Sequence, residues 1–363
     1  MIYFSCFTVS SILMFGAQKF LEKNIKSIGY IFSFLGILVL TILAARRSSY
    51  VGTDTLMYSN FFTEALNSSF KNYFHLLSGF GVEPGFILFN FLISKFTSSV
   101  IFYQGICSFF IEMMIWCGLI EFNKKSTLAL EWIVFCLLFY GNTLNIMRQS
   151  IAVAITFFAY ALWSNKRNKY SILLILVAMT FHKSAVIVFI ALITGTYLFT
   201  RKNSTQLNRS ALLILMLTPF LGLIIEKINA TGILGMKYLN YMNVASSQNI
   251  NAFLIRLPLC ILIIIDLYKN RKNENYTDMW LYLLTLQDLI LLPIQNDSVV
   301  VGRLLLFFSI SKIITYPQAI NDITNNRILR CVLNILLIIL LVIIFYLQVI
   351  NNNNGGIYPY VSY

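Results

Sequence analysis

Charged residues are scarce in this 363-residue chain, at 11% of the sequence, whereas 58% of the residues are hydrophobic. With a mean hydropathy of +0.76, the sequence has too little polar surface to cover a water-soluble globule. Apolar stretches recur along the whole length with short polar loops between them, which leaves no room for a separate soluble domain. The composition therefore predicts a single polytopic transmembrane domain over residues 1–363, all-α in fold class.

Sequence motifs for nucleotide or metal chemistry are missing. Neither GxGxxG nor GxxxxGK[ST] occurs, so the sequence does not support an ATP-driven motor. The cysteines stand mostly in apolar runs without C-x-x-C spacing, which is typical of small buried hydrophobic residues and not of a zinc site or a disulfide framework. We therefore expect no cofactor and no bound metal. The cysteines are Cys6, Cys107, Cys117, Cys136, Cys260 and Cys331.

Positive charge is in excess, with 27 Lys and Arg residues against 14 Asp and Glu residues. These cations come in twos and threes between apolar stretches, as topology signals beside anionic lipid do, and not as a basic nucleic-acid groove. We therefore expect a membrane environment and no nucleic-acid partner. The first apolar stretch, 2–20, has no positive n-region and no small-residue cleavage site, so we expect it to be a retained membrane helix.

The number of helices follows from the stretches that are long enough to cross a bilayer. A membrane helix needs about 20 apolar residues, or fewer where a water-filled cavity shortens the path. On this measure the sequence predicts roughly twelve transmembrane helices, within a range of about ten to fourteen. They are 2–20, 28–45, 98–120, 128–145, 147–163, 170–182, 184–199, 211–226, 252–268, 278–294, 299–316 and 331–350.

Clusters of Lys and Arg set the predicted orientation, because such clusters stay on the cytoplasmic side. Six loops that carry these clusters are then cytoplasmic, and both termini and a large loop over 46–97 lie on the periplasmic side. Within that loop the segment 84–96 is about 20 Å long as a helix, too short to span, so we interpret it as re-entrant or interfacial. Between the clusters at 166–169 and 201–209 the chain must cross twice, which predicts a hairpin with 181–184 at its outer tip.

Several basic residues fall at one depth in this topology. Arg148 opens a predicted helix, and His182 and Lys183 form the hairpin tip. Arg256 and Arg303 each lie about one turn into a helix. Because unpaired cations inside the apolar layer are costly, we predict one outward-facing cationic pocket. Arginine would grip phosphate oxygens there as a two-pronged fork that lysine cannot reproduce.

Each of these basic residues also has a structural interpretation. An arginine at a helix end can extend to the lipid headgroups, and this applies to Arg148, Arg256 and Arg303. The Ile-Ala-Val-Ala run beside Arg148 points the other way, because small residues favour the interior of a helix bundle. A lone histidine such as His182 often serves only as a hydrogen-bonded structural residue, but at a helix break it could act as a general base or polarise a phosphate.

Four carboxylates also have two interpretations. Asp54 is either the N-cap of a helix or a catalytic group. Glu83 is either a turn carboxylate before a proline or an acid near the cationic pocket. Asp288 and Glu112 are the deepest carboxylates, and either can simply pair with a cation on a neighbouring helix.

Four short motifs follow one another along the chain. They are Val51-Gly-Thr-Asp-Thr with Tyr58, Glu83-Pro-Gly-Phe86, Asn145-Ile-Met-Arg-Gln-Ser-Ile-Ala152, and Ala178-Met-Thr-Phe-His-Lys-Ser-Ala185. Together with Pro359-Tyr360 near the end, they resemble the pattern of EpsG-type membrane proteins, which are Wzy-like polymerases of bacterial exopolysaccharide and O-antigen. The resemblance covers most of the chain in order and spacing.

The resemblance implies an all-helical glycosyltransferase of the GT-C kind in the bacterial inner membrane. Such an enzyme joins undecaprenyl-pyrophosphate-linked oligosaccharide repeat units at the periplasmic face, without a nucleotide sugar or a metal, and a chain-length regulator is a possible partner. The hydroxyl proton would go to one of three catalytic candidates, His182, Asp54 or Glu83. The candidates for pyrophosphate binding are Arg148, Gln149, Arg256, Arg303 and Lys183, of which Arg256 and Arg303 come from the topology alone.

Two other function classes fit parts of the sequence. A flippase for the same lipid-linked sugar would show two similar halves with broken helices at matching positions, and we find no such duplication. A ligase or acyltransferase acting on surface glycans would suit a cationic outer pocket equally well.

Overall fold

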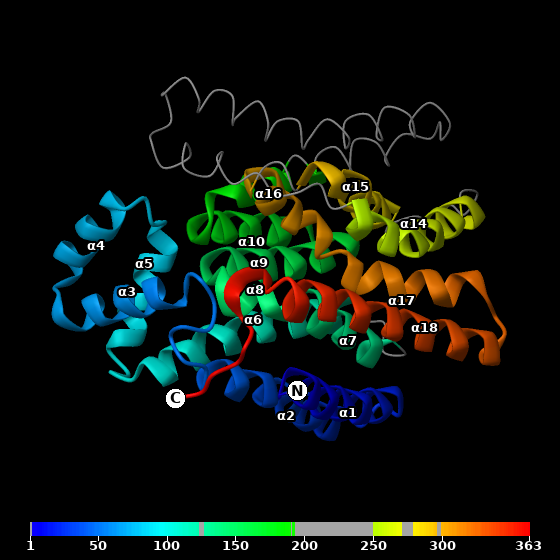
Figure 1. Ribbon diagram of the computed structural model, residues 1–363, viewed down its shortest axis with the longest axis horizontal. Coiled ribbons are helices and arrows are strands. Elements are labelled where there is room, and N and C mark those ends of the chain that lie inside the picture. Colours follow the sequence, from blue (N-terminus) through cyan, green and yellow to red (C-terminus); the bar gives the residue numbers. More distant parts are fainter. Residues whose placement is uncertain (1, 123–126, 190, 193–249, 271–278, 296–298) are drawn as a thin grey trace. The chain divides into compact units, whose positions relative to one another are not determined.

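The computed structural model describes all residues except 1, 123–126, 190, 193–249, 271–278 and 296–298 (Figure 1). Every regular element in these described ranges is a helix, and the β pairing found in them is an isolated bridge between Arg47 and Ser362. The all-α prediction is therefore confirmed for the described part of the chain. Its residues group into two compact units, which we name unit 1 (Met1–Lys183 with Cys331–Tyr363) and unit 2 (Ser184–Arg330).

Within the part of the chain that the structure describes, four helical stretches are long and apolar enough to cross a membrane, which makes the chain a helical membrane protein. The predicted span 211–226 and part of 184–199 lie outside the described residues, so the count of roughly twelve spans stays a prediction. The single transmembrane domain over 1–363 stays a prediction as well. The four stretches are α1 (Ile2–Glu22), α2 (Lys26–Ala45), α6 (Val100–Phe122) and Arg327–Asn351, which contains α18 (Arg327–Phe345).

The core of unit 1 forms around α9 (Met147–Ser164), which packs between α6 and α10 (Asn168–Phe181) (Figure 1). Small residues allow this close packing, since Ala152 and Ala154 are both fully buried. The interior position that the Ile-Ala-Val-Ala run predicts for this helix is therefore confirmed. Arg148 lies in the first turn of α9.

The predicted periplasmic loop folds into the short helices α3 (Thr55–Asn67), α4 (Phe70–Gly79) and α5 (Pro84–Ser94), which contact one another (Figure 1). The ring of Phe62 stacks on that of Tyr103, with 4.4 Å between the centroids, and this contact joins α3 to α6. With 11 residues, α5 is about 16 Å long and too short to span, as predicted. Its re-entrant or interfacial position stays a prediction.

The predicted helix 128–145 is wrong in one respect, because the structure divides it into α7 (Leu128–Leu138) and α8 (Tyr140–Asn145). The interruption lies at Phe139, with φ −121° and ψ −28°, and the weak helix formers Gly141, Asn142 and Thr143 follow it within the short helix α8. Thr143 Oγ1 also donates to the carbonyl oxygen of Tyr140 at 2.8 Å. A hydroxyl bonded to a nearby carbonyl competes with the regular helical pattern.

Unit 2 contains a second broken helix. The predicted helix 299–316 stops early, and a new helix begins at Lys312. At the break, Ser311 Oγ donates to the carbonyl oxygen of Phe308 at 2.7 Å, which again competes with the helical backbone bonds. The helices that the structure describes in this unit include α14 (Ile250–Asn270), α15 (Met279–Gln295), α16 (Val299–Ser309) and α17 (Lys312–Ile323).

Candidate functional site

An ion pair between Arg148 and Glu83 joins two of the sequence motifs. Arg148 Nη1 donates to Glu83 Oε2 at 2.7 Å, and Glu83 Oε1 accepts the backbone N–H of Lys183 at 3.3 Å. Glu83 is only 6% exposed, and a buried carboxylate requires such partners to remain charged. The structure therefore brings together Glu83, Arg148 and Lys183, three of the residues that the sequence predicts for the site.

Gly85 explains how α5 reaches the end of α10. A Cβ atom at Gly85 would lie 2.8 Å from the carbonyl oxygen of Thr180, so any side chain there would push the two helices apart. The last turn of α10 ends at Phe181, and His182 follows in an extended conformation with φ −156° and ψ 120°. The close approach thus places the half-buried His182 and its neighbour Lys183 at the start of α5.

Tyr58, in the first motif, lies against Arg148. Its side chain is 3% exposed, and burial raises the pKa of the phenol, while the neighbouring guanidinium acts in the opposite direction. Asp54 also acts on Tyr58 electrostatically, which puts Asp54 near the same cluster. Sequence reasoning assigned no role to Tyr58, although its spacing one helical turn after Asp54 was an available signal.

Asp54 occupies the N-cap position of α3, but its side chain makes no capping hydrogen bond. The carboxylate instead accepts a hydrogen bond from Thr53 Oγ1 at 3.3 Å. The backbone N–H of Asp54 donates to Asn145 Oδ1 at 3.0 Å, which links the first motif to the third. The capping interpretation therefore holds for the position of Asp54 and not for its side chain. Asn145 is a further residue that the sequence prediction of the site omits.

Arg148 keeps donors that can bind an anion. Its Nε atom is buried and has no hydrogen-bond partner within the residues that the structure describes. The side chain as a whole is 21% exposed, so an anion can approach it from outside the protein, although not at the buried Nε. A guanidinium carries five N–H donors in one plane, which suits phosphate oxygens. Gln149 follows in α9 and is 2% exposed.

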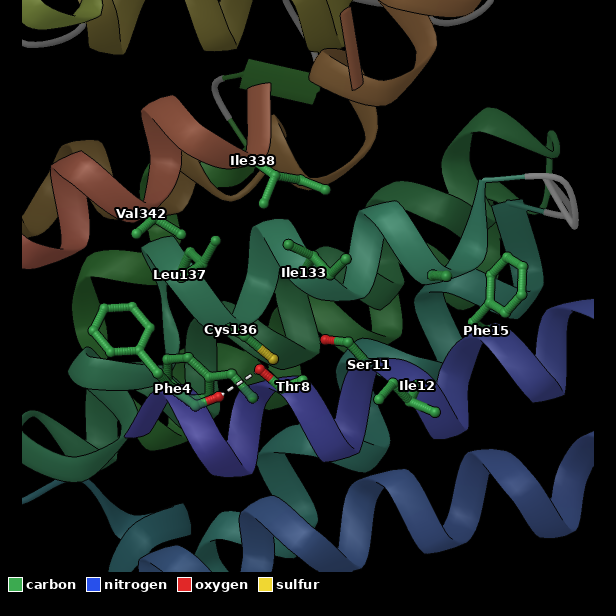
Figure 2. A pocket seen from close by; sticks show the side chains of 12 residues that line it. Phe4, Thr8, Ser11, Ile12, Phe15, Ile133, Cys136, Leu137, Ile338 and Val342 are labelled. Carbon is green, nitrogen blue, oxygen red and sulfur yellow. Dashed lines mark hydrogen bonds between the residues drawn. The ribbon is translucent and has the colours of Figure 1, made fainter. Parts of the chain in front are cut away.

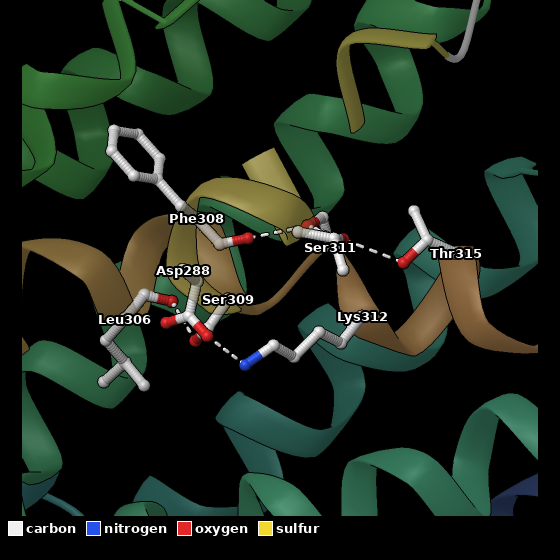
Figure 3. Close-up of polar contacts among 8 residues, drawn as sticks. Asp288, Leu306, Phe308, Ser309, Ser311, Lys312 and Thr315 are labelled. Atoms are coloured by element: carbon white, nitrogen blue, oxygen red, sulfur yellow. Dashed lines mark hydrogen bonds and ion pairs between the residues drawn. The ribbon is translucent and has the colours of Figure 1, made fainter. Parts of the chain in front are cut away.

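A second group of charges is buried inside unit 2. The Lys312 ammonium and the Asp288 carboxylate form an ion pair (Figure 3), and Asp288 acts electrostatically on Arg256 and Tyr316. None of the four residues is more than 7% exposed. The prediction that Asp288 pairs with a cation on a neighbouring helix is confirmed, and its partner Lys312 was not predicted.

The two units divide the predicted arginines. Arg148 belongs to unit 1, whereas Arg256 on α14 and the half-buried Arg303 on α16 belong to unit 2. The predicted meeting of these three guanidinium groups in one pocket therefore stays a prediction.

Glu112 differs from the expectation for a deep carboxylate. Its two oxygens accept hydrogen bonds from the hydroxyl groups of Ser108 and Thr41, both at 2.7 Å. The sequence interpretation that Glu112 pairs with a cation is wrong, because hydroxyl groups from α6 and α2 satisfy the carboxylate instead. Among the described residues, no group of three or more His, Cys, Asp or Glu side chains could hold a metal ion.

An apolar groove of about 380 Å³ runs along α1 in unit 1, between α1, α7 and α18 (Figure 2). Phe4 and Ile12 line it from α1, Ile133 from α7, and Ile338 and Val342 from α18. Such a lining suits a hydrocarbon chain and does not suit a charged group.

No curated protein and no solved structure matches the chain. A profile of the EpsG family matches residues 30–362, which include all four motifs and Pro359-Tyr360.

Proposed function

The chain belongs to the EpsG family, and from this premise we propose that it is a glycosyltransferase that joins lipid-linked oligosaccharide repeat units into a polysaccharide. The family suggests a function related to exopolysaccharide polymerisation. The proposed enzyme is a GT-C-like protein of roughly twelve transmembrane helices that acts at the periplasmic face of the bacterial inner membrane. The observation that carries the proposal is the cluster of the half-buried Arg148 with the buried Glu83 and Tyr58, beside Asp54.

The proposed reaction starts from two sugars on lipid diphosphate carriers. A hydroxyl oxygen of the acceptor sugar attacks C1 of the donor sugar and forms the new glycosidic bond. The bond between C1 and the diphosphate oxygen breaks, and the lipid diphosphate leaves with the electron pair. Because this leaving group is already a stable anion, the protein mainly has to balance its charge and orient the hydroxyl.

The geometry suggests separate roles for the residues of the cluster. Arg148, with Gln149 beside it, would bind diphosphate oxygens, and the exposed Lys183 would add a second positive charge. Both oxygens of Glu83 already accept hydrogen bonds, so its role would be to hold Arg148 in place. The hydroxyl proton would then pass to Asp54 or His182. In unit 2, Arg256 and Arg303 remain proposed phosphate ligands.

The apolar groove offers a place for the polyprenyl chain of the substrate. Tyr3, at the Phe4 end of the groove, donates to the carbonyl oxygen of Ile357 at 2.6 Å. The preceding Gly356 accepts a hydrogen bond from the Asp54 loop. A lipid chain in the groove would therefore lead toward Asp54. Because the groove is linked to the Asp54 loop in this way, we favour the lipid-linked substrate over an ordinary phospholipid as its occupant.

Filling the groove should slow polymerisation. We expect Ile338→Trp to reduce the yield of long chains several-fold, because the larger ring takes up volume that the polyprenyl chain needs. Ile335→Trp is the matched control, since Ile335 is also on α18 but is 52% exposed. Equal yields from the two variants would argue against this use of the groove. A wild-type protein that uses a substrate with a very short lipid as well as one with the full polyprenyl chain would do so too.

Deletion of the gene tests the proposed function directly. We expect cells without this protein to carry single repeat units on their surface in place of long chains. The purified protein should extend an undecaprenyl-pyrophosphate-linked oligosaccharide into a ladder of products that electrophoresis resolves. Complete loss of surface sugar would indicate export or an earlier transferase, and transfer to a different acceptor without a ladder would indicate a ligase.

A further inference from the structure

The segment 352–363 lies against the loop that carries Asp54. The backbone N–H groups of Gly52 and Thr53 donate to the carbonyl oxygens of Gly356 and Gly355 at 2.8 and 3.0 Å. Gly52 and Thr53 directly precede Asp54 in the chain. The Asp54 loop therefore receives part of its backbone hydrogen bonding from a segment about 300 positions away in the sequence.

Contacts along the rest of this segment fix it to the end of α2. Ser48 N–H donates to the carbonyl oxygen of Val361 at 2.8 Å, and Tyr363 N–H donates to that of Arg46 at 2.9 Å. The hydroxyl group of Tyr360 donates to the carbonyl oxygen at the end of α2, on Leu43, at 2.8 Å. Figure 1 shows this red segment returning to the end of α2. The motif residue Tyr360 thus helps to attach the segment 352–363 to the end of α2.

Asn145 connects the segment to the third motif. Its Oδ1 atom accepts hydrogen bonds from Thr53 Oγ1 at 2.9 Å and from the backbone N–H of Asp54 at 3.0 Å. Gly355 packs directly on this side chain, because a Cβ atom there would lie 3.0 Å from Asn145 Nδ2. Gly355 also has a φ of +80°, a backbone conformation that favours glycine. The turn at Gly355 therefore sets the position of Asn145, and Asn145 sets that of Asp54.

We propose that Gly355, Gly356 and Asn145 are positioning residues for Asp54 in the polymerisation reaction. The proposal rests on the function proposed above and adds residues from two further segments to its site. The physical reason is that catalysis is sensitive to displacement of a reacting group by as little as about 1 Å. Two backbone hydrogen bonds and one side-chain acceptor hold the three residues before α3, so losing any of them lets Asp54 move.

The variant Gly355→Ala tests this arrangement. We expect its added methyl group to displace Asn145 and to lower the turnover rate by about 10- to 100-fold, with little change in KM for the lipid-linked substrate because Arg148 is untouched. Gly81→Ala is the matched control. Gly81 has a similar φ of +70° but no atom within 4 Å of the added methyl group, so the backbone strain is comparable without the contact.

A second pair of variants separates the side-chain contact from the backbone conformation. Asn145→Ala removes the acceptor of Thr53 and Asp54 and should lower turnover in the same way. Asn142→Ala, in the same short helix α8 and also half-buried, should retain normal turnover. If Gly355→Ala and Asn145→Ala match their controls in turnover, the positioning role is overturned while the proposed function stands.

Hydrogen exchange gives a readout that does not depend on activity. In Gly355→Ala, the peptide amides over residues 50–57 should exchange faster than in the wild-type protein and in Gly81→Ala, because their partners have moved. Unchanged exchange in that peptide would overturn the inference. If instead exchange changes as expected but the wild-type protein extends no lipid-linked sugar, the proposed function fails and the positioning of Asp54 remains.

Discussion

Replacement of Arg148 by alanine is expected to lower the rate of polymerisation by about 100- to 1,000-fold, as the loss of a preorganised charge-stabilising donor does in other enzymes. The guanidinium of Arg148, at the start of α9, is held by a hydrogen bond to Glu83. Its Nε atom is buried and has no hydrogen-bond partner among the described residues. Arg148→Lys should recover little, because an ammonium group cannot form two parallel hydrogen bonds to a phosphate. The measurement is the rate of ladder formation from the lipid-linked oligosaccharide.

Two controls accompany the Arg148 variants. Arg167→Ala removes an exposed arginine that pairs with Glu121 at 3.2 Å, and it should leave polymerisation unchanged. Glu83→Gln keeps the shape of the side chain but removes its charge, so it should weaken the hold on Arg148 and give an intermediate rate. Near-normal activity of Arg148→Lys would show that a positive charge alone suffices. The proposal that Arg148 forms two parallel hydrogen bonds to the diphosphate would then be wrong.

Breaking the ion pair inside unit 2 is expected to have the largest effect on stability. Lys312→Ala leaves the carboxylate of Asp288 buried without its ammonium partner, and Asp288 is only 4% exposed. The expected loss is about 3–5 kcal/mol in the free energy of unfolding, because an uncompensated buried charge is strongly unfavourable. Thermal unfolding of the purified protein in detergent measures the loss.

Replacing both partners distinguishes a stabilising ion pair from a substrate site. The double variant Asp288→Leu with Lys312→Met removes both charges, and it should recover most of the stability that Lys312→Ala loses. The exposed pair of Lys19 and Glu22 is the control, where Lys19→Ala should change stability by less than about 1 kcal/mol. A double variant that is stable but fails to polymerise would show that the pair serves the reaction and not only the stability of the fold.

The sequence predicted those features that depend on local composition. The length and hydropathy of the apolar stretches located α1, α2 and α6, because a helix must bury about 20 apolar residues to cross a bilayer. The alanines beside Arg148 also predicted correctly that α9 lies inside the bundle. The motifs identified the family across nearly the whole chain.

Features that depend on tertiary partners could not be predicted in the same way. At the break before Lys312, the hydroxyl groups of Ser309 and Ser311 each bond a carbonyl three residues back. Ser33 makes a similar bond inside the unbroken helix α2, so a serine in the sequence does not by itself mark a break. Tyr58 and Asn145 gain their roles only from side chains far away in the sequence. The ion pair between Glu83 and Arg148 could not be predicted from the sequence either, because nothing in the two motifs specifies that their charged residues pair with each other.

The burial of α9 has a consequence for the way in which this protein responds to its bilayer. α1 and α18 present large exposed side chains such as Val9 and Ile335, and in a bilayer these side chains would meet the acyl chains. A thicker or thinner membrane is accommodated by tilting of such outer helices. α9 is surrounded by protein along almost its whole length. Arg148 at its first turn is therefore insulated from changes in annular lipid that act on the periphery of unit 1.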